Sequence, residues 1–446
     1  LRGPVAFEGT LDIQGSDWRS EGALRSEGAD IEGFGFGKAE LLLSASPEGV
    51  ELRKGSSAEI VEGGGRVMLA GRLGLSPGLP LSLALDLQHM EFQKLMKQLS
   101  VTDGAIVDWV LSGPIQLEGQ CVPLRLDGPL RLVSERFSAF DRPWHDPARQ
   151  RVTGAPRGDL VARVTVRPDA LRFEQIKGRT PLTRLEAMVH VGFDDRLRVL
   201  ARSDAFDASE TAPLVDMGIA GVGGFELEVG PTYAEAGLVG SIWLDGFELS
   251  GLMLGDMRAR AQLEKGGVAV RFRDVDVRRG RSEYRVEDLF IDFERGFELT
   301  ADARLASLSL DDFYGSVGLA GDPRFSSYRG TLHGRGQVRY RGSSARGGDR
   351  DRLTVDLDAV VDELDVDGLR FESGAVLASW DWLGVERGYR SATLELQRLR
   401  LNKGQGALHV QGSMKPGGVL HMTALGERLS LRQTEPAMQA DPLLRG

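Results

Sequence analysis

The stretch LPLSLALDLQ, residues 79–88, alternates a leucine with a residue that is small, polar or proline. Successive side chains of a β-strand point to opposite faces of a sheet, whereas a helical face needs apolar residues three or four positions apart. A strand here would place five leucines on one face: Leu79, Leu81, Leu83, Leu85 and Leu87. The stretch therefore predicts a β-strand with one apolar and one polar face.

The same alternation continues along the chain. Further apolar stripes include Ala39, Leu41 and Leu43; Leu160, Ala162, Val164 and Val166; Leu185, Ala187, Val189, Val191 and Phe193; Phe225, Leu227 and Val229; Val268, Val270 and Phe272; Leu289, Ile291 and Phe293; Phe297, Leu299 and Ala301; Leu353, Val355 and Leu357; and Leu408 with Val410. The 58 glycines, nearly double the usual share of about 7%, fall mainly between these stripes. The pattern predicts an all-β fold of antiparallel strands joined by short hairpins.

Helical periodicity is rare. In HMEFQKLMKQLS, residues 89–100, four apolar residues follow the i, i+3, i+4, i+7 spacing: Phe92, Leu95, Met96 and Leu99. This spacing predicts a short helix near 90–99, and similar short elements are expected near 205–218 and 310–317.

These elements predict a repeated unit. Alignment anchors for the helical segments lie 115, 102 and 121 residues apart, at His89, Asp204, Ala306 and Glu427. The spacing predicts repeats of about a hundred residues, each with many strands and one short helix. We expect such repeats in 1–140, 160–340 and 353–446, the last cut off at the C-terminus. Their Pro, Gly and Arg content predicts exposed loops at 141–159 and 341–352.

Composition argues against several classes of protein. Fifty-five basic and 65 acidic residues give a formal charge of −10, which argues against nucleic acid as a partner. The sequence has no apolar run of about 18 residues that could cross a bilayer. The chain begins at Leu1 directly in a strand pattern, so we expect a fragment of a longer protein whose membrane anchor lies elsewhere. The single cysteine, Cys121, excludes an internal disulfide and a multi-cysteine metal site.

No motif indicates an enzyme. GFGFGK, residues 33–38, lacks the first glycine and the final Ser or Thr of a phosphate-binding loop, so we expect a flexible β-turn there. The acidic run at 362–374 ends in Gly374, where a calcium loop needs a bidentate Glu. The six histidines show no metal-ligand spacing, and no nucleophile motif is present. We therefore predict no catalytic residue, no metal site and no cofactor.

A one-sided sheet must cover its apolar face, because burying one Leu or Val contributes about 1.5–3 kcal/mol. The predicted helices are too few and too short for this. The sheet must close on itself, pack on a second sheet, or hold an apolar ligand. A curved sheet that forms a groove for lipid satisfies the third option.

Two segments resemble the periplasmic repeat region of the TamB and AsmA-like family of bridge-like lipid-transfer proteins. They are LSLALDLQHMEFQKLMKQLS (81–100) followed by GPIQLEGQ (113–120), and ADARLASLSLDDFYGSVG (301–318) followed by RGTLHGRGQVRY (329–340). The shared plan is a strand, a short amphipathic helix and a glycine-flanked strand. The resemblance implies an elongated, curved antiparallel β-sheet groove, called a β-taco.

The resemblance also implies a function. It implies a non-enzymatic periplasmic protein, anchored to the inner membrane by a segment missing from this chain, that conducts phospholipid acyl chains between the inner and outer membranes. It further implies contact with membranes through regions outside this fragment, an outer-membrane barrel protein as a partner, and a role in outer-membrane protein assembly. Neither the anchor nor the partner-binding region of the family is recognisable in this sequence.

The groove interpretation predicts the residues that line the lipid path. They are Leu41, Leu79, Leu81, Leu83, Leu85, Leu87, Val164, Val166, Val189, Val191, Leu227, Val270, Ile291, Leu299, Val355 and Val410. The alternative is a structural or adhesive cell-envelope protein, a solenoid or stacked sandwich whose apolar stripes pack on one another without ligand. A carbohydrate-active enzyme is the weakest hypothesis, because no platform of aromatic residues is visible.

Overall fold

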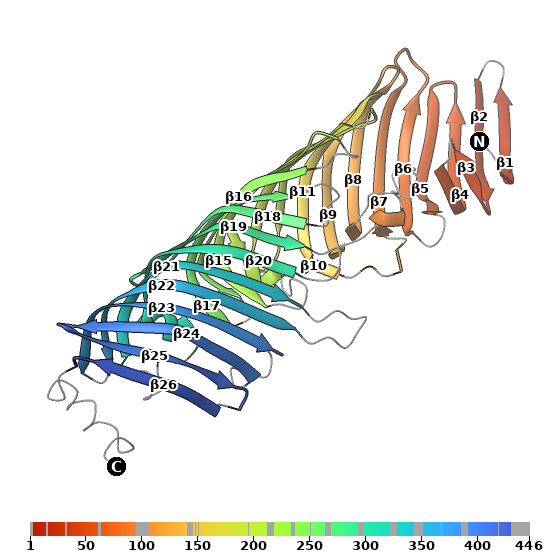
Figure 1. The fold of residues 1–446 in the computed structure, drawn as a ribbon. Coiled ribbons are helices and arrows are strands. Elements are labelled where there is room, and N and C mark those ends of the chain that lie inside the picture. Colours follow the sequence, from red (N-terminus) through yellow and green to blue (C-terminus); the bar gives the residue numbers. More distant parts are fainter. Residues whose placement is uncertain are drawn as a thin grey trace. The chain divides into compact units, whose positions relative to one another are not determined.

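The computed structural model confirms that the chain is all-β and antiparallel (Figure 1). It describes residues 3–14, 17–31, 34–60, 64–94, 107–140, 146–147, 149, 151–194, 196–211, 218–232, 237–249, 251–263, 269–292, 298–316, 318, 320, 328–342, 351–366, 368–384, 391–417 and 419–429. The chain divides into two compact units. The first comprises Leu1–Asp216 and Gly223–Leu238, and the second comprises Met217–Val222 and Val239–Gly446.

The first unit contains most of the N-terminal half. Its elements are β1 (Val5–Gln14), β2 (Asp17–Ser26), β3 (Ala29–Ile31), β4 (Phe34–Ser46), β5 (Gly49–Ile60), β6 (Arg66–Gly74), β7 (Pro80–Glu91), β8 (Val107–Cys121), β9 (Leu124–Phe140), β10 (Arg151–Ala155), β11 (Gly158–Val166), β12 (Ala170–Arg179), β13 (Arg184–Gly192), β14 (Leu197–Asp207) and the 3₁₀-helix η2 (Ala208–Thr211). From β4 to β9 each strand pairs antiparallel with the next. β9 then pairs with both β10 and β11, and the order continues to β14.

The second unit repeats this simple plan. Its elements are β17 (Leu252–Leu263), β18 (Ala269–Arg279), β19 (Ser282–Asp292), β20 (Glu298–Ser309), α2 (Leu310–Ser316), β21 (Tyr328–Arg341), β22 (Arg352–Val366), β23 (Leu369–Leu383), β24 (Ala392–Lys403), β25 (Gly406–Lys415) and β26 (Val419–Glu427), with β15 (Ile219–Gly230) and β16 (Gly237–Leu249) shared between the units. Each strand from β16 to β26 pairs antiparallel with its sequence neighbour.

Within each unit the sheet is curled and open (Figure 1). Among the described residues, β1 pairs only with β2, and β26 pairs only with β25. Two-residue turns join β8 to β9, β18 to β19 and β24 to β25, and the chain lays its strands down one after another. This meander follows from the short glycine-rich connections between alternating segments.

Bulges interrupt the alternation at several places. In β12 the register with β13 shifts between Phe173 and Ile176, and Gln175 between them has a φ of 52°. Without the bulge, period-two alternation would place Phe173 and Ile176 on opposite faces. With it, both pack against the same hydrophobic cluster.

Glycines allow β8 and β9 to approach closely. Gly113 has a φ of 135°, and a β-carbon there would overlap the carbonyl oxygen of Arg131. A β-carbon at Gly128 would overlap the carbonyl oxygen of Gln116. Because both obstacles are backbone atoms, neither strand can yield without disturbing the pairing.

The predicted short helices are only partly present. The helix expected near 310–317 is confirmed as α2. Near 205–218, residues up to Asp207 belong to β14, and only η2 is helical in the described part of that segment. Near 90–99, β7 extends to Glu91, residues 92–94 are helical, and 95–99 lie outside the described residues. A repeating unit of about a hundred residues with one helix in each is therefore not shown.

Each of the two short helices makes the same kind of contact with a nearby hairpin turn. The Glu210 carboxylate of η2 accepts hydrogen bonds from the Thr180 hydroxyl and, at 2.9 Å, from the Leu182 N–H in the β12–β13 turn. The Asp312 carboxylate of α2 likewise accepts hydrogen bonds from the Arg281 N–H and the Ser282 hydroxyl, both at 2.8 Å, at the β18–β19 turn. Each helix thereby ties its own strand to the hairpin that precedes it.

Two sequence predictions need correction, and a third lies mostly outside the described residues. The expected loop at 141–159 contains β10 and the start of β11, because residues 151–155 extend the sheet beside the end of β9. GFGFGK, which we expected to form a turn, lies in β4 from Phe34 onward. In the expected loop at 341–352, Arg341 ends β21 and Arg352 begins β22, while 343–350 lie outside the described residues.

Replacing Gly128 by alanine should destabilise the first unit by about 1–3 kcal/mol, the usual range for overpacking. The added methyl group would force β8 and β9 apart at Gln116. Denaturant unfolding followed by circular dichroism would measure the loss. Gly28→Ala is the matched control, since a β-carbon at Gly28 meets nothing within 4 Å. Equal stability of the two variants would contradict the close approach.

The Glu210 contact should make stability depend on pH. Burial alone would raise the pKa of Glu210, but hydrogen bonds from Thr180, Thr183 and the Leu182 N–H outweigh it and lower the pKa below its ordinary value. A lowered folded-state pKa stabilises the protein above the unfolded pKa of about 4.3, and the stabilisation is lost as the pH falls. Glu210→Gln should therefore cost about 1 kcal/mol at pH 7 and progressively less below about pH 4. A difference in urea-unfolding free energy that stays constant from neutral to acidic pH would refute this.

Candidate functional site

The leucines of β7 lie in the middle of a continuous apolar face. Residues directly opposite each other in an antiparallel pair project to the same side of the sheet. Leu83 lies opposite Gly71 of β6 and Leu117 of β8, and Leu85 lies opposite Leu69 and Ile115. The apolar stripe of each strand therefore adjoins that of its neighbours.

The register carries this face across the first unit. In β11, Ala162 lies opposite Leu130 of β9, and Val164 lies opposite Phe173 of β12. The next strands add the following side chains: Val189 and Val191 of β13, and Leu197 and Val199 of β14. Towards the N-terminus, Leu41 of β4 lies opposite Leu24, which in turn lies opposite Phe7 of β1. We call this surface the first apolar face.

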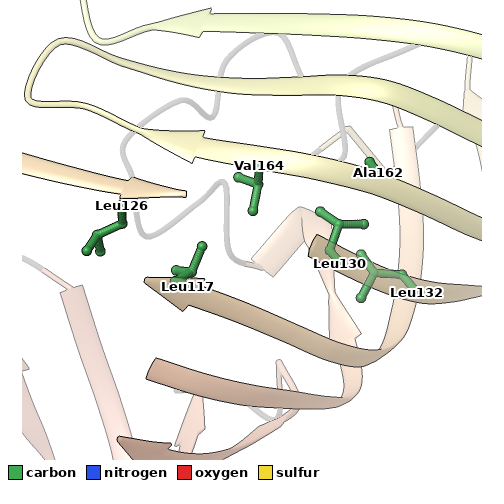
Figure 2. Close-up of a cluster of buried hydrophobic side chains, with 6 residues drawn as sticks. All are labelled: Leu117, Leu126, Leu130, Leu132, Ala162 and Val164. Atoms are coloured by element: carbon green, nitrogen blue, oxygen red, sulfur yellow. The ribbon is translucent and has the colours of Figure 1, made fainter. Parts of the chain in front are cut away.

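The first apolar face is densest between β8 and β11. Figure 2 shows its cluster of buried side chains, all less than 10% exposed: Leu117, Leu126, Leu130, Leu132, Ala162 and Val164. Along β7 the leucines are only half-buried, and the residues between them are exposed. At β1 the face lies open, because Phe7 and Ile13 are 56% and 65% exposed. The face is thus partly packed and partly accessible.

The second unit carries an equivalent surface, the second apolar face. Ile291 of β19 lies opposite Val270 of β18 and Leu299 of β20. Leu299 lies opposite Tyr340 of β21, and Tyr340 lies opposite Leu353 of β22. A parallel row runs through Val338, Val355, Trp380, Leu394 and Met414.

The faces opposite to the two apolar faces are polar and carry ion pairs between neighbouring strands. Arg163 Nε donates to Asp127 Oδ1 at 2.9 Å, and Arg352 Nε donates to Asp381 Oδ1 at 2.8 Å. These hydrogen bonds from arginine hold the pKa values of Asp127 and Asp381 below their usual range. Exposed pairs of this kind contribute little stability. These exposed ion pairs show which face of the sheet is turned towards water in each unit.

The predicted lining residues are brought together within each unit, with one exception. Leu41, Leu81, Leu83, Leu85, Leu87, Val164, Val166, Val189 and Val191 lie on the first apolar face, and Val270, Ile291, Leu299, Val355 and Val410 lie on the second. Arg198 Nε contacts Glu228 Oε1 at 3.1 Å on the polar side, so alternation places Leu227 on the apolar side of β15.

Leu79 is the exception. It precedes β7 in a turn and has a φ of 49°, so its backbone is not extended. Its N–H donates to the carbonyl oxygen of Ser76 at 2.9 Å, and its own carbonyl accepts from Cys121. The interpretation of Leu79 as a strand residue was wrong because the turn chemistry of SPG overrides the alternation.

Sequence reasoning missed the aromatic members of the second apolar face. Tyr284, Tyr340, Trp380 and Trp382 all lie opposite apolar-face residues. The signal was present in SWDWL, residues 379–383, where two tryptophans alternate with polar residues. Tyr284 is well enclosed, and its hydroxyl donates to the Leu254 carbonyl at 2.7 Å. Burial raises its pKa to about 12.

Both apolar faces offer aliphatic and aromatic surface for an apolar ligand. Across the described ranges, no three acidic, histidine or cysteine side chains converge as a metal site requires. None of the helices that the structure describes has the length and apolar character needed to span a bilayer. No protein-family model and no curated protein matches this chain.

Replacing Leu85 by asparagine should weaken binding of an apolar dye such as Nile red, because the change puts an amide on the accessible part of the first apolar face. Asp86→Asn is the matched control, since it creates the same side chain one residue away on the polar face. A fluorescence titration would compare the two variants. Equal dye binding would show that the β7 leucines are not an accessible apolar surface.

Proposed function

We propose that this protein is a non-enzymatic lipid-transfer protein whose apolar faces bind the acyl chains of phospholipids. The observation that carries the proposal is the continuity of each apolar face through successive strands of an open sheet. Strands that pack only on one another would bury this surface, whereas the leucines of β7 remain half-buried and β1 lies open. A ligand that covers them would contribute about 0.8 kcal/mol for each buried methylene group.

The dimensions of the first apolar face suit an acyl chain. Eight strands lie side by side from β6 through β9 and from β11 to β14. At about 4.8 Å between strands, they span about 35 Å. One acyl chain extends about 15 Å, half of the hydrocarbon core of a bilayer. The face can therefore accept more than one chain along its length, as conduction requires.

The proposal includes a groove built from repeats. Two equivalent contacts, one made by Glu210 and one by Asp312, support it, because each short helix ties the strand before it to the preceding hairpin turn of its own unit. We propose that these helices close successive repeats of about a hundred residues in a β-taco groove. The resemblance of residues 81–120 and 301–340 to the TamB and AsmA-like family supports the same architecture.

The family resemblance also supports a place for the protein. We propose that it acts in the periplasm, anchored to the inner membrane by a segment outside this chain, and carries phospholipid between the two membranes. An outer-membrane barrel protein is the proposed partner. Contact with such a partner would couple lipid delivery to outer-membrane protein assembly.

Photo-crosslinking tests the lipid path directly. A photoreactive amino acid at Leu83 or Val355 should capture phospholipid from vesicles, whereas the same group at Ser82 or Asp356 should not. Each control lies one residue away on the exposed polar face of the same strand. Mass spectrometry of the protein would identify the captured lipid. Equal labelling at all four positions, or none, would favour the alternative of a structural β protein with a dry interior.

A further inference from the structure

Trp380 and Trp382 form a stacked pair on the second apolar face. Their ring centroids lie 6.3 Å apart and their planes are inclined by 24°. Trp380 lies opposite Val355 of β22 and Leu394 of β24. Trp382 lies opposite Leu353 and Ala392 in the same two strands. The pair is thus set among aliphatic side chains.

The two indole N–H groups differ in their partners. Trp382 Nε1 donates to Ser391 Oγ at 3.0 Å. Trp380 Nε1 is buried and has no hydrogen-bond partner among the described residues. A buried tryptophan N–H group usually donates a hydrogen bond, and burying it without an acceptor is energetically unfavourable. The aliphatic residues opposite Trp380 offer no side-chain oxygen or nitrogen.

The pair lies near the strand ends, which form the boundary of the second apolar face. β23 ends one residue after Trp382, at Leu383, and β22 begins at Arg352. On the opposite, polar face of the same strand ends, Arg352 and Asp381 form an ion pair with nitrogen–oxygen distances of 2.8 and 2.6 Å. Away from this end, the face continues through Val355, Leu357 and Val376. Tryptophan suits such a boundary because it has an apolar body and one polar edge.

We propose that Trp380 donates its indole N–H to an ester carbonyl of a diacyl glycerophospholipid, while both rings contact the first carbons of the acyl chain. This inference rests on the proposed lipid-binding function and adds a specific anchor to it. The ester carbonyl supplies the missing acceptor at the junction of an apolar chain and a polar headgroup. The pair would hold that junction at the strand ends, with the acyl chain along the second apolar face.

Binding of ester-linked and ether-linked phosphatidylcholine tests the hydrogen bond, because the ether lipid has the same chains without carbonyls. The wild-type protein should bind the ester lipid about fivefold more tightly, the effect of one hydrogen bond. Trp380→Phe should lose this preference while still binding lipid, and Trp243→Phe should retain it. Trp243 lies in β16 opposite Arg258, on the polar face. Equal affinity of the wild type for both lipids would overturn the inference.

Quenching gives a second, independent measurement. Phosphatidylcholine brominated near its carbonyls should quench wild-type tryptophan fluorescence, and Trp380→Phe and Trp382→Phe should each lose part of that quenching, unlike Trp243→Phe. Bound lipid is counted in every sample by mass spectrometry. Lipid bound without loss of quenching in Trp380→Phe overturns the anchor and leaves the proposed function standing. Absence of bound lipid from all samples overturns both.

Discussion

Strict alternation within strands, combined with antiparallel register between them, is the constraint on which this structure depends. A strand such as β7 can separate its leucines from its polar residues only by facing two environments. Each neighbouring strand must then match its own stripe to that face, because a slip of one residue would turn every side chain to the wrong side. Repetition of this matching from strand to strand produces the two apolar faces.

An open sheet of this kind leaves part of its apolar surface exposed. Where β8, β9 and β11 approach closely, the side chains between them are buried, and glycines such as Gly128 make that approach sterically possible. The first apolar face opens at β1 and the second at β26, where Phe7 and Leu420 are each more than half exposed. The polar faces need no such cover, since cross-strand pairs such as Arg163 with Asp127 lie in water. Stability and ligand binding would therefore draw on the same side chains in this protein.

The proposed function follows from surface rather than from a reacting group. The side chains that converge on the apolar faces are aliphatic and aromatic. Among the carboxylates with lowered pKa values, Asp127 and Asp381 pair with arginine, and Glu210 accepts hydrogen bonds at a hairpin turn. Trp380 and Trp382 are two aromatic members of the second apolar face, and each carries an N–H group. Their position at the end of β23 gives an otherwise uniform path a place where a lipid headgroup could be held.

Alternation and turn composition alone were enough to predict an all-β antiparallel fold, and all but one of the predicted lining residues lie on its apolar faces, because alternation and turn formation are local properties of the sequence. Leu79 was predicted to lie in a strand, but a proline-glycine turn overrides the alternation there. Residues 151–155 were predicted to lie in a loop, but they form β10 because they pair with β9. The bulge at Gln175, the placement of Ile176 beside Phe173, and the meeting of Val355 with Trp380 were decided only in the folded chain. Register between strands depends on the fit of whole faces, and no single segment contains that information.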